Sequence, residues 1–265
     1  MPDLTWPQMR QLESFFVQTI RNFPGNPVVI SEGDSWFSFP VHASLMDHLD
    51  EMVQRRMSLL RLESSGAEIL DVLDAGGRSS LRKLLRRYKP DVLLFSGGGN
   101  DIVGPELLTL IAPRGGGAFD LAAALSRAQL ATLFGNIRAA YEALIAIRKE
   151  VAPGCIIVTH SYGNAIPSGR GASLWGFPAG PWLKPFLDAL GYNAAEQRAV
   201  VGGLMQRFND ILDALADPHF IKVDVRPAIS DDEWNDEIHP SRKGFEDAAR
   251  LIHEKLQEIL PTKFP

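Results

Sequence analysis

The chain has 265 residues, 45% hydrophobic and 22% charged, which is typical of a globular protein with a sizeable core. Its net charge of −5 comes without any long basic run, so we do not expect nucleic acid as a partner. The single cysteine, Cys155, excludes an internal disulfide framework.

No stretch stands out as a transmembrane segment. The first residues also lack the basic flank and long apolar core of a signal peptide. We therefore expect a cytoplasmic protein, although a trimmed leader would leave no trace in this chain.

The first predicted element is a helix within residues 1–26. Apolar residues recur at helical spacing over residues 6–20, and Thr5 precedes them as an N-cap. A turn-rich segment then leads into residues 28–30, an apolar β-branched run that predicts a buried strand. This strand runs into Gly33-Asp34-Ser35, which indicates a tight turn.

Strand and helix patterns then alternate to the end of the chain. Short apolar runs predict four further strands, at residues 58–63, 91–96, 155–159 and 220–225. Apolar residues at helical spacing predict helices at residues 42–56, 80–88, 133–147, 201–215 and 245–259. Ser79 or Ser80 is the expected N-cap of the second of these helices.

The predicted fold class is α/β, because strands that alternate with helices form parallel sheets covered on both faces. We expect a flavodoxin-like three-layer sandwich with a five-stranded parallel sheet, and we hypothesise the strand order 2-1-3-4-5. No linker or internal repeat divides the chain, so residues 1–265 are expected to form a single domain. Two insertions, residues 102–118 and 164–192, are expected to lie over the active site.

Ser35 stands at the carboxyl end of the first strand, where open α/β sheets place their chemistry. A serine hydroxyl is a weak nucleophile alone and needs a base, an acid that orients the base, and donors for an oxyanion. Candidates for these groups occur after the second and third strands and before the last helix, at residues 64–66, 97–101 and 236–241.

Four segments together resemble the SGNH hydrolases, a superfamily also called GDSL esterases and lipases. They are Gly33-Asp34-Ser35, Ser65-Gly66, Gly98-Gly99-Asn100-Asp101 and Asp236-Glu237-Ile238-His239-Pro240-Ser241. Each segment is unspecific alone, whereas the four in this order, at strand ends and before the last helix, are specific. The resemblance covers most of the chain and implies a serine hydrolase.

The resemblance also implies a role for each matching residue. Ser35 would be the catalytic nucleophile, His239 the base and Asp236 the acid that orients His239. The backbone N–H groups of Ser35 and Gly66 and the side-chain amide of Asn100 would form the oxyanion hole.

Two positions depart from the family pattern, although neither removes a catalytic atom. Trp36 replaces the leucine that usually follows Gly-Asp-Ser, and no asparagine precedes Ser65-Gly66. Simpler alternatives also exist: residues 236–239 alone fit a surface loop, and Gly97-Gly98-Gly99 could cradle a phosphate. However, the lysine and the Ser/Thr of a P-loop are missing after these glycines.

Substrate-binding residues are predicted from their positions. Trp36 and Phe37 follow the serine, His160 ends the fourth strand, and Trp175 and Trp182 lie in residues 164–192. These aromatic rings could wall an apolar pocket for the acyl or alcohol part of a substrate. The alternative is that the rings pack residues 164–192 against the rest of the domain and that His160 has a structural role.

We therefore expect a serine hydrolase that cleaves a carboxylic ester of a small molecule or glycan. We expect no metal and no cofactor, because the histidines lack the paired spacing of metal ligands. A carbohydrate O-deacetylase or an acyl-thioesterase would use the same triad. The alternative of another class is a non-catalytic binding module on the same fold. The sequence indicates neither the acyl chain length nor the oligomeric state.

Overall fold

The computed structural model of the protein describes residues 6–174 and 176–265. Its central sheet has five parallel strands in the order β2-β1-β3-β4-β7. The strands are β1 (Val28–Gly33), β2 (Ser58–Arg61), β3 (Val92–Ser96), β4 (Ile156–His160) and β7 (Phe220–Val223). Since β7 is the fifth strand of this sheet along the chain, the predicted order 2-1-3-4-5 is confirmed.

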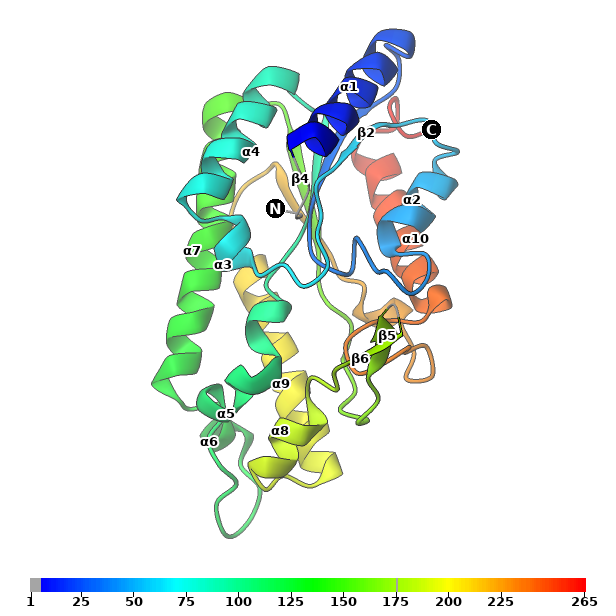
Figure 1. Ribbon diagram of the computed structural model, residues 1–265. Coiled ribbons are helices and arrows are strands. Elements are labelled where there is room, and N and C mark those ends of the chain that lie inside the picture. The colour runs from blue at the N-terminus through cyan, green and yellow to red at the C-terminus, as the bar shows by residue number, and fades with distance from the viewer. Residues whose placement is uncertain (1–5, 175) are drawn as a thin grey trace.

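Helices cover both faces of the sheet and make three layers (Figure 1). One face carries α2 (Leu45–Met52) and α10 (Arg242–Ile259), which pack against each other. The other face carries α4 (Ala75–Tyr88), α7 (Ala128–Val151) and α9 (Ala194–Asp213). The first helix, α1 (Trp6–Asn22), lies against the edge strand β2. The predicted α/β sandwich is therefore confirmed.

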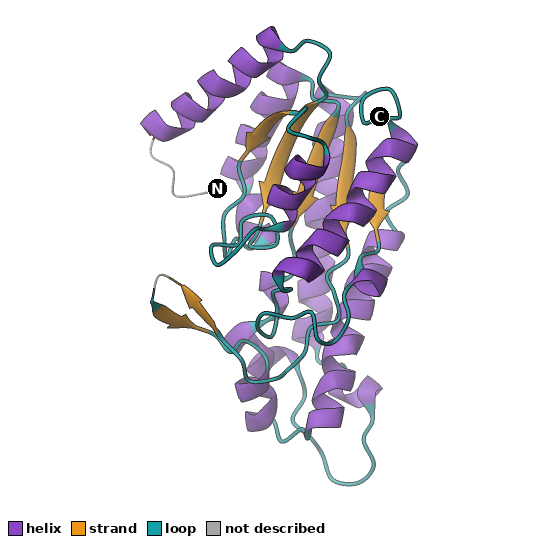
Figure 2. Cartoon of the chain, turned by 90° about the vertical axis from the view of Figure 1, so that its right-hand side faces the viewer, coloured by secondary structure: helices purple, strands orange, loops and turns teal. Residues whose placement is uncertain are grey.

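The central strands are buried on both faces, as the continuous apolar runs predict. All residues of β3 are buried, and in β1 only Val28 is partly exposed. Because the strands are parallel, their carboxyl ends meet at one edge of the sheet, the lower edge in Figures 1 and 2. The loops that carry the predicted catalytic residues gather at this edge.

The start of α4 differs from the predicted one. The helix begins at Ala75, ahead of Ser79 and Ser80, so neither serine is its N-cap. Asp74 caps the helix instead, because its carboxylate accepts a hydrogen bond from Gly77 N–H at 2.7 Å. Aspartate is as strong an N-cap as serine. Gly76 and Gly77 are weak helix formers, so the sequence pattern did not indicate the first helical turn.

The two insertions contain short elements that the sequence pattern does not predict. Residues 102–118 include η2 (Gly104–Glu106) and α5 (Leu107–Leu110), with η1 (Asn100–Ile102) before and α6 (Leu121–Ala124) after them. Residues 164–192 include α8 (Lys184–Ala189) and an antiparallel hairpin of β5 (Ala172–Leu174) and β6 (Phe177–Ala179) that projects from the body (Figure 2). The remaining short elements are α3 (Ile69–Val72) and η3 (Arg226–Ala228).

One described helix, α7, is long and apolar enough to cross a membrane by length and composition alone. Its buried residues include Leu130, Ile137, Tyr141 and Leu144, and it packs against α4 and α9. Burial of this kind is typical of a core helix that covers a sheet, so we assign α7 to the core.

Candidate active site

A tight turn after β1 places Ser35 at the carboxyl edge of the sheet. Ser38 N–H donates to the carbonyl of Asp34 at 3.1 Å, which closes the turn. Gly33, the last residue of β1, precedes this turn at a point where β1 passes very close to β3. A Cβ at Gly33 would lie 2.2 Å from the carbonyl oxygen of Ser96, so only glycine fits at this position.

Ser35, His239 and Asp236 come together as a hydrogen-bonded triad. Ser35 Oγ lies 2.8 Å from His239 Nε2. On the other side of the ring, His239 Nδ1 lies 2.9 and 3.0 Å from the two carboxylate oxygens of Asp236. Because a carboxylate only accepts hydrogen bonds, this contact places a proton on Nδ1 and leaves Nε2 to accept the proton of Ser35.

The carboxylate of Asp236 is fully buried and has further donors. Its Oδ1 accepts hydrogen bonds from Ile238 N–H at 3.0 Å and His239 N–H at 2.9 Å, and its Oδ2 accepts one from the Asn235 amide at 3.0 Å. Burial acts to raise the pKa of Asp236, but the hydrogen bond and charge interaction with His239, together with the hydrogen bonds from Ile238 and Asn235, outweigh it, so the pKa lies below its ordinary value. Asp236 therefore stays ionised and fixes the tautomer of His239.

A buried polar network holds the residue next to the nucleophile. Asp34 Oδ1 accepts a hydrogen bond from the Ser96 hydroxyl at 2.7 Å, and Asp34 Oδ2 accepts one from the Tyr162 hydroxyl. Ser96 Oγ also lies 3.0 Å from His160 Nε2. Burial raises the pKa of Tyr162 and lowers the pKa of His160, so both side chains favour their neutral forms. The network fixes the turn that carries Ser35.

Asn100 and Gly66 lie in two loops that are tied together at the same edge. Asn100 Nδ2 donates to the carbonyl of Ala67 at 2.9 Å, and the Asp101 carboxylate accepts a hydrogen bond from Ile69 N–H at 2.9 Å. Burial raises the pKa of Asp101 to about 6. Gly66 has a left-handed φ of +80°, which favours glycine. The loop contacts thus connect the two segments predicted to supply oxyanion donors.

A small cavity of about 30 Å³ opens beside Ser35. Ser35 and Asn100 both line it, together with Asp34 and Gly99. Its other walls are mostly apolar and consist of Trp36, Val103, Tyr162, Ala165, Met205 and Ile238. His239 is not among these lining residues, although its neighbour Ile238 is.

The residues predicted to bind substrate lie in different places. Trp36 lines the cavity, and the Trp182 ring meets the His239 ring with 5.3 Å between their centroids. Phe37 and His160 are buried against each other, with 5.5 Å between ring centroids, and neither lines the cavity. Trp175 lies outside the described residues.

Glu237 is a buried acid between Asp236 and His239, and the sequence motif assigns it no role. Its carboxylate accepts three backbone hydrogen bonds: Oε1 from Gly169 at 2.8 Å and Lys184 at 2.9 Å, and Oε2 from Leu183 at 2.6 Å. In addition, its own carbonyl accepts a hydrogen bond from Ile166 N–H at 3.1 Å. Glu237 therefore fastens the insertion 164–192 to the loop that carries Asp236 and His239. Its position inside a matched motif was the one available signal.

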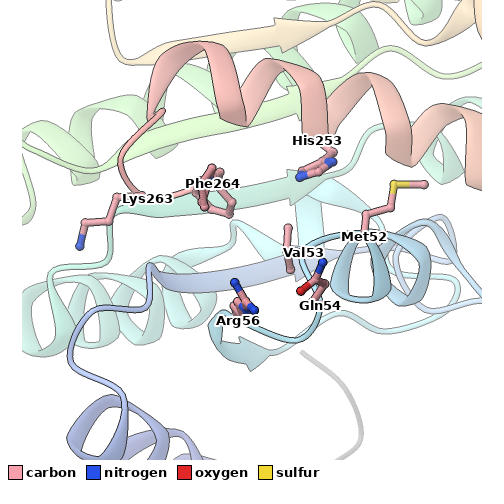
Figure 3. A pocket seen from close by; sticks show the side chains of 8 residues that line it. Met52, Val53, Gln54, Arg56, His253, Lys263 and Phe264 are labelled. Carbon is pink, nitrogen blue, oxygen red and sulfur yellow. The ribbon is translucent and has the colours of Figure 1, made fainter.

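Another cavity, of about 70 Å³, lies near the C-terminus, at the amino ends of the strands (Figure 3). Its lining includes Met52, Arg56, His253 and Phe264, and Ser35 is not part of it. Within residues 6–174 and 176–265, no group of three or more His, Cys, Asp or Glu could hold a metal ion.

Comparison with known proteins agrees with this geometry. The model of a family described as "GDSL-like Lipase/Acylhydrolase family" matches residues 30–246. A search of curated proteins found no match.

Solved structures of several hydrolases are similar to this chain. Phospholipase A1 from Streptomyces albidoflavus NA297 is 17% identical, with 87% of this chain and 99% of that chain covered and a TM-score of 0.51. An extracellular lipase from Streptomyces rimosus is 16% identical, with 84% and 98% covered and a TM-score of 0.52. An acetyl esterase mutant with an acetate ion is 12% identical, with 89% and 98% covered and a TM-score of 0.51. At these identities the likeness concerns the fold alone.

Proposed function

Since the chain belongs to the GDSL-like lipase/acylhydrolase family, we propose that it cleaves carboxylic esters through a covalent acyl-enzyme on Ser35. The observation that carries this proposal is the 2.8 Å contact of Ser35 Oγ with His239 Nε2, on a ring whose Nδ1 faces Asp236. Nucleophile, base and orienting acid are thus within hydrogen-bond reach in the order that acyl transfer needs.

Acylation begins when Ser35 Oγ attacks the ester carbonyl carbon and gives its proton to His239 Nε2. A bond from Oγ to the carbonyl carbon forms, and the carbonyl oxygen becomes an oxyanion. The ester C–O bond then breaks, and the departing oxygen takes the proton from Nε2. Asp236 stabilises the imidazolium that exists between these two steps, because its carboxylate stays ionised.

Deacylation repeats the same steps with water as the nucleophile. His239 accepts a proton from water, which attacks the acyl carbon, and then returns a proton to Ser35 Oγ as the carboxylic acid leaves. In both half-reactions the Asn100 amide and the backbone N–H groups of Gly66 and Ser35 would stabilise the oxyanion. The contact of Asn100 with the carbonyl of Ala67, next to Gly66, supports this shared role.

The same triad would hydrolyse a thioester or an acetylated carbohydrate, because the chemistry does not depend on the leaving atom. A non-catalytic binding module would have no need of the ordered contacts from Ser35 to Asp236. We keep ester hydrolysis as the main proposal because the family model covers the whole triad.

Hydrolysis of a panel of p-nitrophenyl esters tests the proposal. We expect the protein to turn over at least one of them and Ser35→Ala to lose nearly all of this activity. Ser38→Ala is a matched control, because Ser38 is half-buried in the same loop. Equal turnover by wild type and Ser35→Ala would contradict the proposed function.

A further inference from the structure

Asp34, Ser96 and His160 form a buried chain of hydrogen bonds that the proposed reaction steps do not use. Asp34 is 2% exposed, and Ser96 and His160 are 1% exposed each. At one end of the chain, His160 Nδ1 lies 2.7 Å from the carbonyl oxygen of Ser161. In the middle, Ser96 Oγ lies 3.0 Å from His160 Nε2 and 2.7 Å from Asp34 Oδ1. Each of these contacts needs a proton between its two atoms.

An ionised Asp34 and a neutral His160 together are one proton short of this requirement. The carbonyl of Ser161 only accepts, so the single proton of a neutral imidazole lies on Nδ1 and leaves Nε2 as an acceptor. Ser96 Oγ then stands between two acceptors. It can donate its one proton to Nε2 or to Asp34, but not to both. The other acceptor would stay buried without a donor, which is unfavourable.

From this count we propose that the chain from Asp34 to His160 holds one additional proton, which offsets the charge of Asp34 beside Ser35, and that His160 is the positioning residue that keeps the proton there. The inference rests on the proposed function of Ser35. When Ser96 donates to Asp34, the additional proton lies on Nε2, and when Ser96 donates to Nε2, it lies on Asp34 Oδ1.

A shift of the two hydrogen-bonded protons along the chain joins these arrangements, so the additional proton belongs to the chain and not to one residue. Burial favours a neutral ring at His160, which the arrangement with the proton on Asp34 satisfies. The net charge of the chain is zero in both arrangements.

The groups packed around the chain leave this proton count unchanged. Tyr162 donates its hydroxyl to the other carboxylate oxygen of Asp34, and Tyr141 of α7 also lies nearby. Burial raises the pKa of both hydroxyls, so neither is charged near neutral pH. The apolar rings of Trp36 and Phe37 contact the imidazole, with 5.2 and 5.5 Å between ring centroids.

The charge of Asp34 matters because of its place in the site. Asp34 directly precedes Ser35, and it lines the same cavity as Ser35 and Asn100. A carboxylate without an offsetting proton would oppose the negative charge that develops on the carbonyl oxygen of the substrate. One unit charge several ångströms away changes a rate by about tenfold or more at an effective dielectric constant of about 20. The additional proton should therefore raise kcat.

The pH dependence of stability tests the proton count without any substrate. In the unfolded chain, histidine loses its proton near pH 6.5 (about the ordinary value). If the folded chain keeps a proton at higher pH, the stability that His160 contributes is complete below about pH 6.5 and decreases as the pH rises above it.

His160→Gln is the variant for this test. Its amide N–H can replace Nε2–H as a donor to Ser96, and Ser96 can then donate to Asp34 without an additional proton. Urea denaturation at a series of pH values measures the difference in the free energy of unfolding between wild type and His160→Gln. We expect this difference to shrink above about pH 6.5. A difference that instead grows from about pH 5 to about pH 6.5 and then stays level would overturn the inference.

His48→Gln is the matched control for loss of a buried histidine. His48 is buried in α2, and within residues 6–174 and 176–265 its Nε2 has no hydrogen-bond partner. Burial lowers its pKa, so the difference between wild type and His48→Gln should show the opposite pattern, with growth up to about pH 6.5 and no decrease above it. Its kcat should stay close to the wild-type value.

Kinetics on p-nitrophenyl acetate near pH 7 test what the proton does for catalysis. His160→Gln should lower kcat by about tenfold, with a much smaller change in KM, because the oxyanion forms only after the substrate binds. Adding Asp34→Asn to His160→Gln removes the charge that the first change exposes. The asparagine amide can accept from Ser96 and donate to Tyr162, so we expect kcat to rise above that of His160→Gln.

The order of these rates separates charge from packing. Losses caused only by disturbed packing would add, so a double variant slower than His160→Gln would overturn the inference. An unchanged kcat in His160→Gln would do the same. If wild type hydrolyses no ester, the proposed function fails, whereas the pH dependence of stability still decides whether the chain holds the additional proton.

Discussion

The indole of Trp182 meets the imidazole of His239 edge to face, with 5.3 Å between ring centroids and 82° between ring planes. Trp182 follows the β5–β6 hairpin and directly precedes Leu183, whose N–H donates to Glu237 at 2.6 Å. The insertion 164–192 therefore supplies a wall beside the imidazole of His239, the proposed base.

We predict that Trp182→Ala changes selectivity for the alcohol part of the ester. The loss of the ring should raise KM for naphthyl acetate more than for methyl acetate, because the larger alcohol has more apolar contact to lose. Trp182→Phe should recover much of the difference. Uniform loss on both esters, with lower thermal stability, would mean that the ring only packs the insertion.

Asn100→Ala should lower kcat by about a hundred- to thousand-fold, the usual effect of losing one oxyanion donor. KM should change far less, because the oxyanion exists only in the transition state and the intermediates. Steady-state kinetics on one acetate ester measures both constants. A change confined to KM would show that Asn100 binds the substrate in its ground state.

Glu237→Gln should destabilise the fold and loosen the insertion. The carboxylate satisfies three buried backbone N–H groups, and an amide in its place turns a donor toward one of them. We expect a loss of about 1–3 kcal/mol in the free energy of unfolding, measured by urea denaturation. Glu254→Gln, at an exposed position in α10, is the control. Equal stability of the two variants would contradict this role of Glu237.

Stability should fall as the pH rises through neutrality, and Glu32 should be one cause. Glu32 is buried in β1, and burial, with a smaller contribution from nearby Glu63, raises its pKa from 4.5 to about 8. Between these pH values the folded protein keeps a proton that the unfolded chain has lost, so the free energy of unfolding decreases with pH.

Glu32→Gln removes this titration, so its stability relative to wild type should be higher near pH 8 than near pH 5. Urea denaturation at a series of pH values measures the difference, again with Glu254→Gln as the control. Parallel pH profiles for wild type and Glu32→Gln would refute the shifted titration.

The sequence predicts the sheet and the triad because each leaves a local signal. Buried strands such as β3 are continuous apolar runs, and Ser35, Asp236 and His239 stand in short motifs at strand or helix ends. The hairpin of the insertion has strands too short for a clear period-two pattern.

The residues that surround and hold the triad leave no local signal in the sequence. Glu237 binds backbone N–H groups, which almost every residue type offers, so its partners cannot be read from side chains. Met205 is one of many apolar residues on α9, and only the packing of α9 beside the loops after β1 and β3 brings it to the cavity. Tyr162 likewise reaches Asp34 only through the tertiary fold.

The most direct test of the account is to find the residue that carries the covalent intermediate. The protein is incubated with a fluorophosphonate, digested and analysed by peptide mass spectrometry, with Ser35→Ala and Ser38→Ala in parallel. The account predicts one labelled peptide with the adduct on Ser35, retained in Ser38→Ala and absent in Ser35→Ala. An unlabelled wild-type protein that hydrolyses esters, or a label on another residue that persists in Ser35→Ala, would contradict it.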